Sequence, residues 1–262
     1  MIKLLGRFFT DIKTCRYILS NLVNQELTVK YKRSVLGILW SLLSPLATMT
    51  IGSIVFGSIM RFALKDFVVF LYAAMLPWNF FAICVDFCGA SMINAEGFIK
   101  KIYIPKIVFP LSTICAQFIN MLLSMVSMFI IMLFLGAKTT IALTFLPVSF
   151  LILFIFTLGV SLIVATLNVY FRDFRYLTSI IMTGWFYLTP ILYPLDAIPE
   201  NMRGFFVFNP SYYLVDLFRQ PIYYNAFPSA KTLLIMISIA LFVFLAGLSY
   251  FYSKEHDFVY RL

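Results

Sequence analysis

Charged side chains are scarce in this sequence of 262 residues. Lys, Arg, Asp and Glu account for 12% of it, about half the share found in a soluble protein, whereas apolar residues account for 62%. The mean hydropathy is +0.96. A chain with so little polar surface cannot cover a water-soluble globule, so the composition predicts an integral membrane protein. The net charge of +9 is attributed to membrane orientation, and no nucleic-acid partner is expected.

Catalytic and nucleotide-binding motifs are also missing. The sequence has no GxxxxGKS/T loop for phosphate, no HExxH motif for zinc and no GxSxG motif for a serine nucleophile. The single histidine, His256, lies between two acidic residues after the last apolar window, where a solvated side chain is expected. We therefore expect no catalytic residue, no metal and no cofactor. Energy for any driven transport would come from a partner or from an ion gradient.

Six long windows of the sequence contain no charged residue. Each reaches the roughly 17–25 residues that a helix needs to cross about 30 Å of hydrocarbon. The sequence therefore predicts an all-α integral membrane protein with six transmembrane helices in one domain, residues 34–253. The windows are Ser34–Met60, Phe67–Val85, Ile107–Ala137, Thr139–Phe171, Tyr176–Leu195 and Thr232–Ser253.

Lys and Arg are distributed unevenly between the segments that separate these windows. If both termini lie inside, the inner segments hold fourteen of the twenty basic residues and the outer segments hold six. Short segments rich in Lys and Arg stay in the cytoplasm. We therefore predict that both termini are cytoplasmic, with residues 254–262 as a cytoplasmic tail.

Residues 1–33 place apolar side chains at helical spacing on one side and basic side chains on the other. This pattern is typical of an amphipathic helix that lies in the headgroup plane, where anionic lipids of the inner leaflet attract Lys and Arg. We predict an interfacial segment that fixes the depth and tilt of the first span.

Residues 196–230 are too apolar for a solvent loop and too interrupted by proline for one crossing. We predict short helices that form a re-entrant segment at the outer face, between the fifth and sixth spans. Two interpretations stay open at this point. The segment closes a pathway, or it is an aromatic belt that only anchors the protein.

Asp86 is the one ionisable residue assigned to a predicted span, near the inner half of the second helix. A charge there is costly unless it faces protein or water. Pairing with a cation such as Arg33 or Lys100 is favoured over a role in ion coupling, although the sequence leaves the role of Asp86 open.

Aromatic residues make up 18% of the sequence, with 30 Phe, 15 Tyr and 3 Trp. Their rings offer apolar faces with a polar edge, which suits sugar rings that slide past without tight capture. A lipid-facing belt and an aromatic core explain the same composition, so both interpretations stay open.

Four short motifs follow one another along the chain. They are Lys30–Trp40 (KYKRSVLGILW) with Ser44-Pro45-Leu46, Ile104-Pro105 with its neighbouring lysines, Leu167–Asp173 (LNVYFRD), and Thr189–Tyr193 (TPILY) with Ile198-Pro199 and Asn209-Pro210. In this order they resemble the motifs of type 2 ABC exporter permeases for polysaccharides, the Wzm-like O-antigen group. The resemblance covers essentially the whole chain, and it does not identify the glycan.

The resemblance implies a homodimer that works with two cytoplasmic ATPase subunits, which bind the ATP. The complex would move a lipid-linked glycan, most closely O-antigen, from the inner to the outer face of the cytoplasmic membrane through a channel at the dimer interface. Permeases of the same fold for teichoic acid or capsular polysaccharide are alternatives. A drug or lipid exporter would carry larger outer domains. A membrane-embedded polyprenyl-phosphate enzyme would need acidic metal ligands on one face, whereas Asp173 and Asp196 are predicted on opposite faces.

The resemblance also implies three sets of site residues. A basic inner loop would seat on the ATPase subunit, a basic cluster before the first span would meet a lipid diphosphate or merely orient the span, and aromatic residues would line the channel. Trp185 and Tyr187 lie about 200° apart on their helix, so at most one of them faces the channel squarely. In the same order, the sets are Lys100, Lys101, Pro105 and Lys106; Lys30, Lys32 and Arg33; and Trp40, Trp185, Phe186 and Tyr187.

Overall fold

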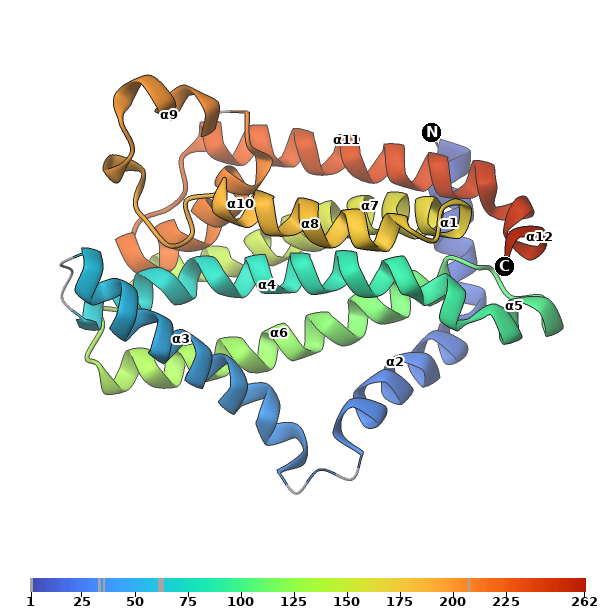
Figure 1. Cartoon of the computed structure of the whole chain (residues 1–262), viewed down its shortest axis with the longest axis horizontal. Helices are drawn as coiled ribbons and strands as arrows, with labels where there is room; N and C mark the ends of the chain where they lie inside the picture. The colour runs from blue at the N-terminus through green and yellow to red at the C-terminus, as the bar shows by residue number, and fades with distance from the viewer. Residues whose placement is uncertain (1, 33, 35, 61–63, 207) are drawn as a thin grey trace.

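The chain folds into a bundle of helices, as the computed structural model shows (Figure 1). The structure describes residues 2–32, 34, 36–60, 64–206 and 208–262, and no β-strand occurs among them, so the predicted all-α class is confirmed. The α-helices are α1 (Ile2–Thr14), α2 (Arg16–Tyr31), α3 (Trp40–Met60), α4 (Leu64–Asn94), α5 (Glu96–Lys101), α6 (Val108–Phe134), α7 (Leu146–Tyr170), α8 (Phe174–Tyr187), α9 (Glu200–Phe206), α10 (Pro210–Arg219), α11 (Ala230–Lys254) and α12 (Phe258–Arg261). Single turns of 3-10 or π-helix are η1 (Gly37–Leu39), η2 (Ile141–Phe145), η3 (Leu195–Ala197), η4 (Gln220–Tyr224) and η5 (Glu255–Asp257).

Within the described residues, four helical segments are long and apolar enough to cross a membrane. They are built on α4, α6, α7 and α11, which run side by side in Figure 1 and overlap the second, third, fourth and sixth predicted windows. Their bounds are Lys65–Lys101, Val108–Phe134, Ile141–Tyr170 and Ala230–Arg261.

The first predicted window contains α3, and the fifth overlaps α8, which begins two residues before that window. Helix α8 has 14 residues and is shorter than its uncharged window. It ends at Tyr187, ahead of Pro190, because proline has no main-chain N–H and its ring clashes with the preceding turn. Residue 35, near the start of the first window, lies outside the described residues.

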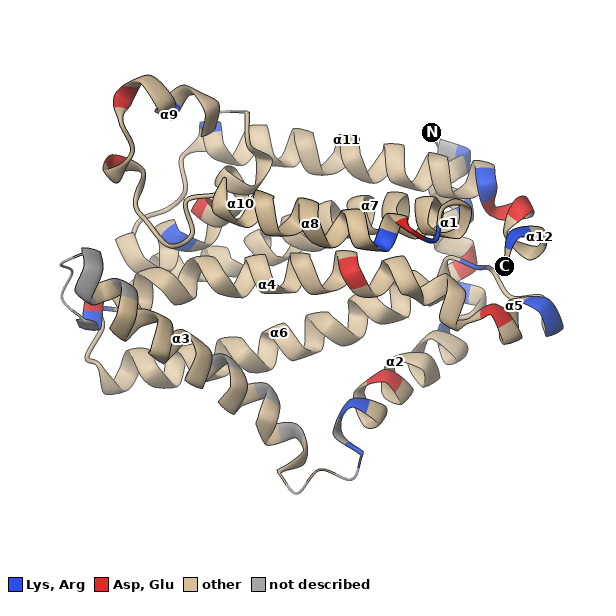
Figure 2. Cartoon of the chain, in the orientation of Figure 1, with Lys and Arg blue, Asp and Glu red and all other residues tan. Residues whose placement is uncertain are grey.

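Apart from η1, which lies between α2 and α3, the short elements gather at the two ends of the bundle (Figure 1). Residues 2–14, 96–107 and 254–262 lie at one end, named here the termini end. Residues 188–206 and 208–224 lie at the other, named the far end. Charged residues concentrate at these ends, whereas the middle of the bundle is mostly uncharged (Figure 2). This distribution is what a helix bundle in a bilayer requires.

The N-terminal segment forms two helices, with Cys15 between them, rather than the single amphipathic helix that was predicted. The apolar side of α1 packs on the bundle, where the buried Phe8 meets Phe244 of α11 with 5.7 Å between ring centres. Helix α2 packs along α6. Both helices therefore dock on the bundle as well as carrying the basic residues.

Two glycines bring α7 and α11 into main-chain contact. A Cβ atom on Gly159 would lie 2.6 Å from the main-chain nitrogen of Phe244, and one on Gly247 would overlap the carbonyl oxygen of Gly159. Small residues at a crossing let two membrane helices approach closely and gain dispersion contacts that lipid cannot replace. Any larger residue at either position would force α7 and α11 apart.

The C-terminal tail is part of the packed structure. After α11 the chain turns through η5 into α12, and Phe258 is fully buried against Phe251 with 5.3 Å between ring centres. The hydroxyl of Tyr170 donates to Asp257 at 2.6 Å, which ties the tail to the end of α7. His256 is exposed, as predicted.

Candidate functional site

Two adjoining cavities open between α2, α3, α4 and α6. Their volumes are about 750 and 430 Å³, and they share Lys30, Ile83 and Gln117 as a common wall. Because α6 runs from the termini end toward the far end, the two cavities follow one another along the bundle. They bring amide, hydroxyl and charged side chains into a bundle whose middle is mostly uncharged.

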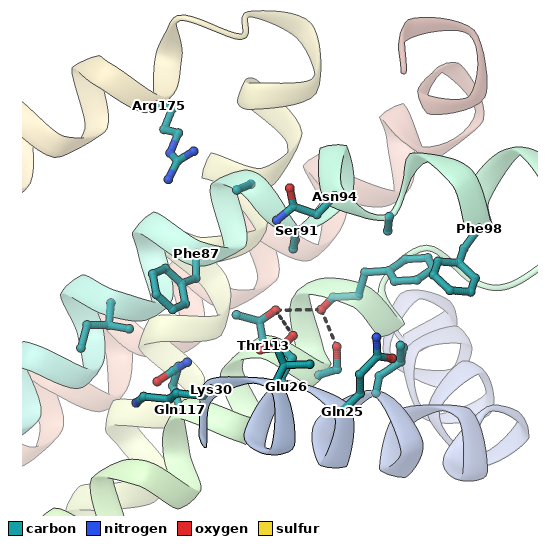
Figure 3. A pocket seen from close by; sticks show the side chains of 17 residues that line it. Gln25, Glu26, Lys30, Phe87, Ser91, Asn94, Phe98, Thr113, Gln117 and Arg175 are labelled. Carbon is teal, nitrogen blue, oxygen red and sulfur yellow. Dashed lines mark hydrogen bonds between the residues drawn. The ribbon is translucent and has the colours of Figure 1, made fainter. Parts of the chain in front are cut away.

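The larger cavity lies nearer the termini end and contains charged groups (Figure 3). The hydroxyl of Thr113 donates to Oε1 of Glu26 at 2.7 Å, and both side chains point into the space between α2 and α6. Burial raises the pKa of the Glu26 carboxyl, and the hydrogen bond from Thr113 opposes this rise with a smaller effect. The polar side chains that line the larger cavity are Gln25, Glu26, Lys30, Ser91, Asn94, Ser112, Thr113, Gln117 and Arg175.

A polar stripe runs along α6. Its members recur at alternating spacings of four and three residues, which places them on one face over about 21 Å of helix. Within the stripe, the Asn120 amide donates to Oε1 of Gln117 at 3.2 Å, and the Ser124 hydroxyl donates to the Asn120 carbonyl at 2.9 Å. The members are Thr113, Gln117, Asn120, Ser124 and Ser127, and all of them are buried.

This stripe is not among the features predicted from the sequence. The signal was present in the window Ile107–Ala137, where amides and hydroxyls recur at heptad spacing, but a search for charges does not detect neutral polar groups. Buried amides in a membrane span are costly unless they meet partners or water, so such a stripe indicates a packed or hydrated polar face.

The smaller cavity combines two aromatic side chains, Trp40 and Phe80, with neutral polar groups and the shared Lys30. Trp40 is half exposed and lines it from α3, together with Asn79 of α4 and with Gln117 and Asn120 of α6. Ser44, Thr48 and Ser124 add hydroxyl groups. An aromatic face beside amides and hydroxyls can stack on a sugar ring and exchange hydrogen bonds with its hydroxyls.

A third cavity, of about 390 Å³, lies between α4 and α8 and includes Asp86. Nε of Arg175 lies 3.9 Å from Oδ1 of Asp86, at the limit of an ion pair. The predicted pairing of Asp86 with Lys100 is wrong, because Lys100 lies on α5 and pairs with Glu96 one turn away at 2.6 Å. The other predicted partner, Arg33, lies outside the described residues.

The structure distributes the predicted channel aromatics over different places. Trp40 lines the smaller of the two adjoining cavities, whereas Phe186 and the exposed Tyr187 line the third cavity. Trp185 packs edge-on against Phe81 of α4, and its indole N–H donates to Asn209 at 2.8 Å. Trp185 and Tyr187 thus face different ways, as their spacing predicted.

The predicted headgroup and loop residues also lie apart. Lys30 lines the two adjoining cavities, Lys32 is exposed after α2, and Arg33 lies outside the described residues. At the termini end, Lys100 and Lys101 are exposed on the last turn of α5. Pro105 and Lys106 follow in the connection to α6, and the main-chain N–H of Lys106 donates to Oε1 of Glu255 at 3.3 Å.

At the far end, two side chains hold the segment that follows α8. Asn209 caps α10 by accepting from Ser211 N–H at 3.0 Å, and its amide donates to the carbonyl of Leu188 at 3.0 Å. Arg219, at the end of α10, donates to the carbonyls of Pro190 and Ile191 at 2.8 and 3.0 Å. Side chains of the predicted re-entrant segment therefore bind the carbonyls of three residues that follow the end of α8.

Known proteins similar in sequence cover most of this chain. The sequence profile described as "ABC-2 type transporter" matches residues 18–223. The O-antigen export system permease protein RfbA of Myxococcus xanthus is 30% identical over 96% of this chain and 98% of its own length. The RfbA protein of Klebsiella pneumoniae is 30% identical over 90% of this chain and 92% of its own length. The polysialic acid transport protein KpsM of Escherichia coli is 25% identical over 88% of this chain and 91% of its own length.

Proposed function

Because the chain belongs to the ABC-2 type transporter family, we propose that it is the permease subunit of an exporter for a lipid-linked polysaccharide of the O-antigen class. The family confirms the resemblance that the motifs indicated. The family also makes the chain a transport subunit rather than an enzyme, and the chain itself is a multi-pass membrane protein. Relatives named for O-antigen export are 30% identical to the chain, and one named for polysialic acid transport is 25% identical. Export of a polysaccharide such as polysialic acid is therefore the second candidate.

The proposed topology has six spans. Helices α3 and α8 supply the first and fifth, in addition to the four segments that are long enough by themselves. The termini end faces the cytoplasm, because it carries the basic residues of α1 and α5, and the far end faces outward. In this orientation residues 196–230 cover the outer mouth.

The polar stripe of α6, with the cavities beside it, is the observation that carries the proposed transport path. A polysaccharide is rich in hydroxyl groups and must leave every site that it visits, so weak neutral contacts suit it better than fixed charges. The larger cavity offers cations near the cytoplasmic side, where a lipid phosphate would lie, and the smaller cavity offers Trp40 and amides where sugars would follow.

The energy source in this proposal is a separate ATPase subunit, two copies of which bind a homodimer of the chain. The exposed lysines of α5, with Pro105 and Lys106, form the contact that receives its motion. ATP is bound by that subunit and not by this chain.

Vesicles that contain the chain with its ATPase subunit test the proposal. ATP should move lipid-linked polysaccharide to the far leaflet, and vesicles with the chain alone should neither hydrolyse ATP nor transport. The double variant Gln117→Leu with Asn120→Leu should lose most of the transport while the protein yield stays normal. Ile119→Leu on the exposed side of α6 is the control. Normal transport by the double variant would remove the stripe from the path.

A further inference from the structure

Glu255 joins three segments at the termini end. Glu255 is only 4% exposed, although it directly follows the last long helix, α11. Nη2 of Arg7 in α1 donates to Oε2 of Glu255, and the main-chain N–H of Lys106 donates to Oε1 at 3.3 Å. Each carboxylate oxygen therefore binds a different part of the chain, while the side chain itself belongs to the end of α11.

The Arg7 side of this junction is fixed by further contacts. The guanidinium lies over the ring of Tyr252, with its central carbon 4.2 Å from the ring centre. The Tyr252 hydroxyl donates to Oδ2 of Asp11 at 2.7 Å, and Nε of Arg7 lies 3.8 Å from the same oxygen. Arg7, Asp11, Tyr252 and Glu255 thus form a closed cluster that docks α1 on α11.

The loop side depends on one hydrogen bond. Among the described residues, the main-chain hydrogen bonds of residues 102–106 otherwise stay within four residues of the donor. Tyr103, at the middle of the loop, is 99% exposed. The bond from Lys106 to Glu255 is the hydrogen bond that joins this exposed loop to a distant part of the chain.

We infer that Glu255 is a positioning residue that couples the loop of residues 102–106 to α1 and α11 at once. A push on this loop then moves the interfacial helix and the last span together, rather than bending the loop alone. The inference rests on the proposed function only for the origin of the push, an ATPase subunit bound at the lysines of α5. The placement of the loop by Glu255 is a property of the permease itself.

Two variants separate the two links. Glu255→Gln keeps an amide oxygen for the Lys106 N–H but removes the charge that pairs with Arg7. The exchange of Arg7→Glu with Glu255→Arg keeps an ion pair between α1 and α11 but leaves the Lys106 N–H without its acceptor. A residue with a merely structural role would affect both segments alike in both variants.

Amide hydrogen exchange of the full chain in lipid nanodiscs measures both links without transport. In the charge exchange, the Lys106 amide should exchange at least tenfold faster while α1 stays protected. In Glu255→Gln, α1 should exchange faster while Lys106 stays protected. Asp257→Asn, on the same tail but bonded to Tyr170 of α7, is the matched control and should change neither segment.

Vesicles with the ATPase subunit then provide the functional measurement. Both variants should keep ATP hydrolysis and lose most of the export for each ATP consumed. Continued protection of Lys106 in the charge exchange, or normal export by either variant, would overturn the inference. If the wild-type complex exports no polysaccharide, the proposed function fails, yet the exchange pattern still decides whether Glu255 places the loop.

Discussion

The two ends of the bundle each hold an arginine, and they hold it in opposite ways. Arg219 at the far end is 6% exposed and donates to two main-chain carbonyls, with its guanidinium 3.8 Å from the centre of the Phe70 ring. The Arg7 side chain at the termini end is 44% exposed and pairs with the carboxylate of Glu255. Carbonyl acceptors do not titrate and cannot exchange partners without moving the backbone, whereas a carboxylate is sensitive to charge, salt and a competing cation. The far end is therefore built to keep one geometry, and the termini end is built to respond.

The chemistry of arginine explains the far end in more detail. Two N–H groups of one planar guanidinium reach consecutive carbonyls, Pro190 and Ile191, which a lysine ammonium cannot match in the same fixed fork. Asp216, three residues earlier on α10, accepts from Gln220 at 2.9 Å and supplies a nearby negative charge. The segment after α8 is thus fastened to α10 without a direct ion pair to Arg219 among the described contacts.

Breaking the connection between the two ends should have the largest effect. Gly247→Val places side-chain atoms where the Gly159 carbonyl lies, so α7 and α11 must separate along their length. We expect a loss of more than about 3 kcal/mol, the upper range for an overpacked core, seen as a collapse of folded yield in size-exclusion profiles. Gly184→Val on α8 is the control, because a Cβ there meets nothing within 4 Å. Equal yields for the two variants would contradict the contact.

Removing Arg219 should break the far end alone. Arg219→Met preserves much of the side-chain volume but leaves the carbonyls of Pro190 and Ile191 without their donors, at a cost of about 1–3 kcal/mol for each. The thermal midpoint in nanodiscs should fall by several degrees, and a cysteine introduced near Leu192 should become reactive to water-soluble reagents. The thermal midpoint of Arg219→Lys should lie between those of the wild type and Arg219→Met, because lysine keeps the charge but lacks the forked pair of N–H donors of arginine. A midpoint equal to that of the wild type in the Met variant would show that these bonds do not hold the segment.

Removing Arg7 tests the other side of the comparison. Arg7→Gln should cost about 1–2 kcal/mol at low salt, because Glu255 stays buried without its cation. Since Arg7 is partly exposed, 1 M NaCl should reduce the difference from the wild type, whereas salt should not reduce the cost of Arg219→Met. The measurement is the thermal midpoint of both variants at two salt concentrations. The same salt response in both variants would remove the distinction between the ends.

The sequence predicted the parts of this protein that depend on composition or on local order. Uncharged windows predicted where the long helices lie, because crossing a bilayer requires apolar residues over the whole length of a span. The motifs predicted the family. The pairs that fasten the two ends were not predictable, because Arg219 and Pro190 are 29 positions apart and Arg7 and Glu255 are 248 apart. Only the packing of helices brings such residues together.

The candidate site shows the same division. Lys30 and Trp40 were found from motifs, and the structure places them on the cavities. Trp185 was predicted for a channel, but its bond to Asn209 depends on the fold of the segment after α8. The stripe of α6 was visible at heptad spacing, and its meaning became clear only when α2, α3 and α4 were placed beside it.

The smallest predicted effect concerns Glu26, whose carboxylate lies in the larger cavity between the two ends of the bundle. It tests how a buried carboxylate behaves without a cation such as the one that Arg7 supplies to Glu255. Burial raises the pKa of Glu26 in the folded protein above its value in the unfolded chain, so the folded state binds this proton more tightly. Stability then falls as pH rises from the unfolded value, about 4.3, to the folded one, and the full cost of the buried charge is present above both. Glu26→Gln removes this titration, so the variant should be more stable than the wild type at pH 7 and equally stable below pH 4. The gain in stability at pH 7 should be smaller than the loss expected for Arg7→Gln. Thermal midpoints in nanodiscs across this range measure the effect.

Glu96→Gln is the control and should gain no stability at pH 7, because it loses the ion pair with Lys100. A wild type that is more stable than the Glu26 variant at pH 7 would mean that the ionised carboxylate, bound by Thr113, stabilises the cavity rather than straining it.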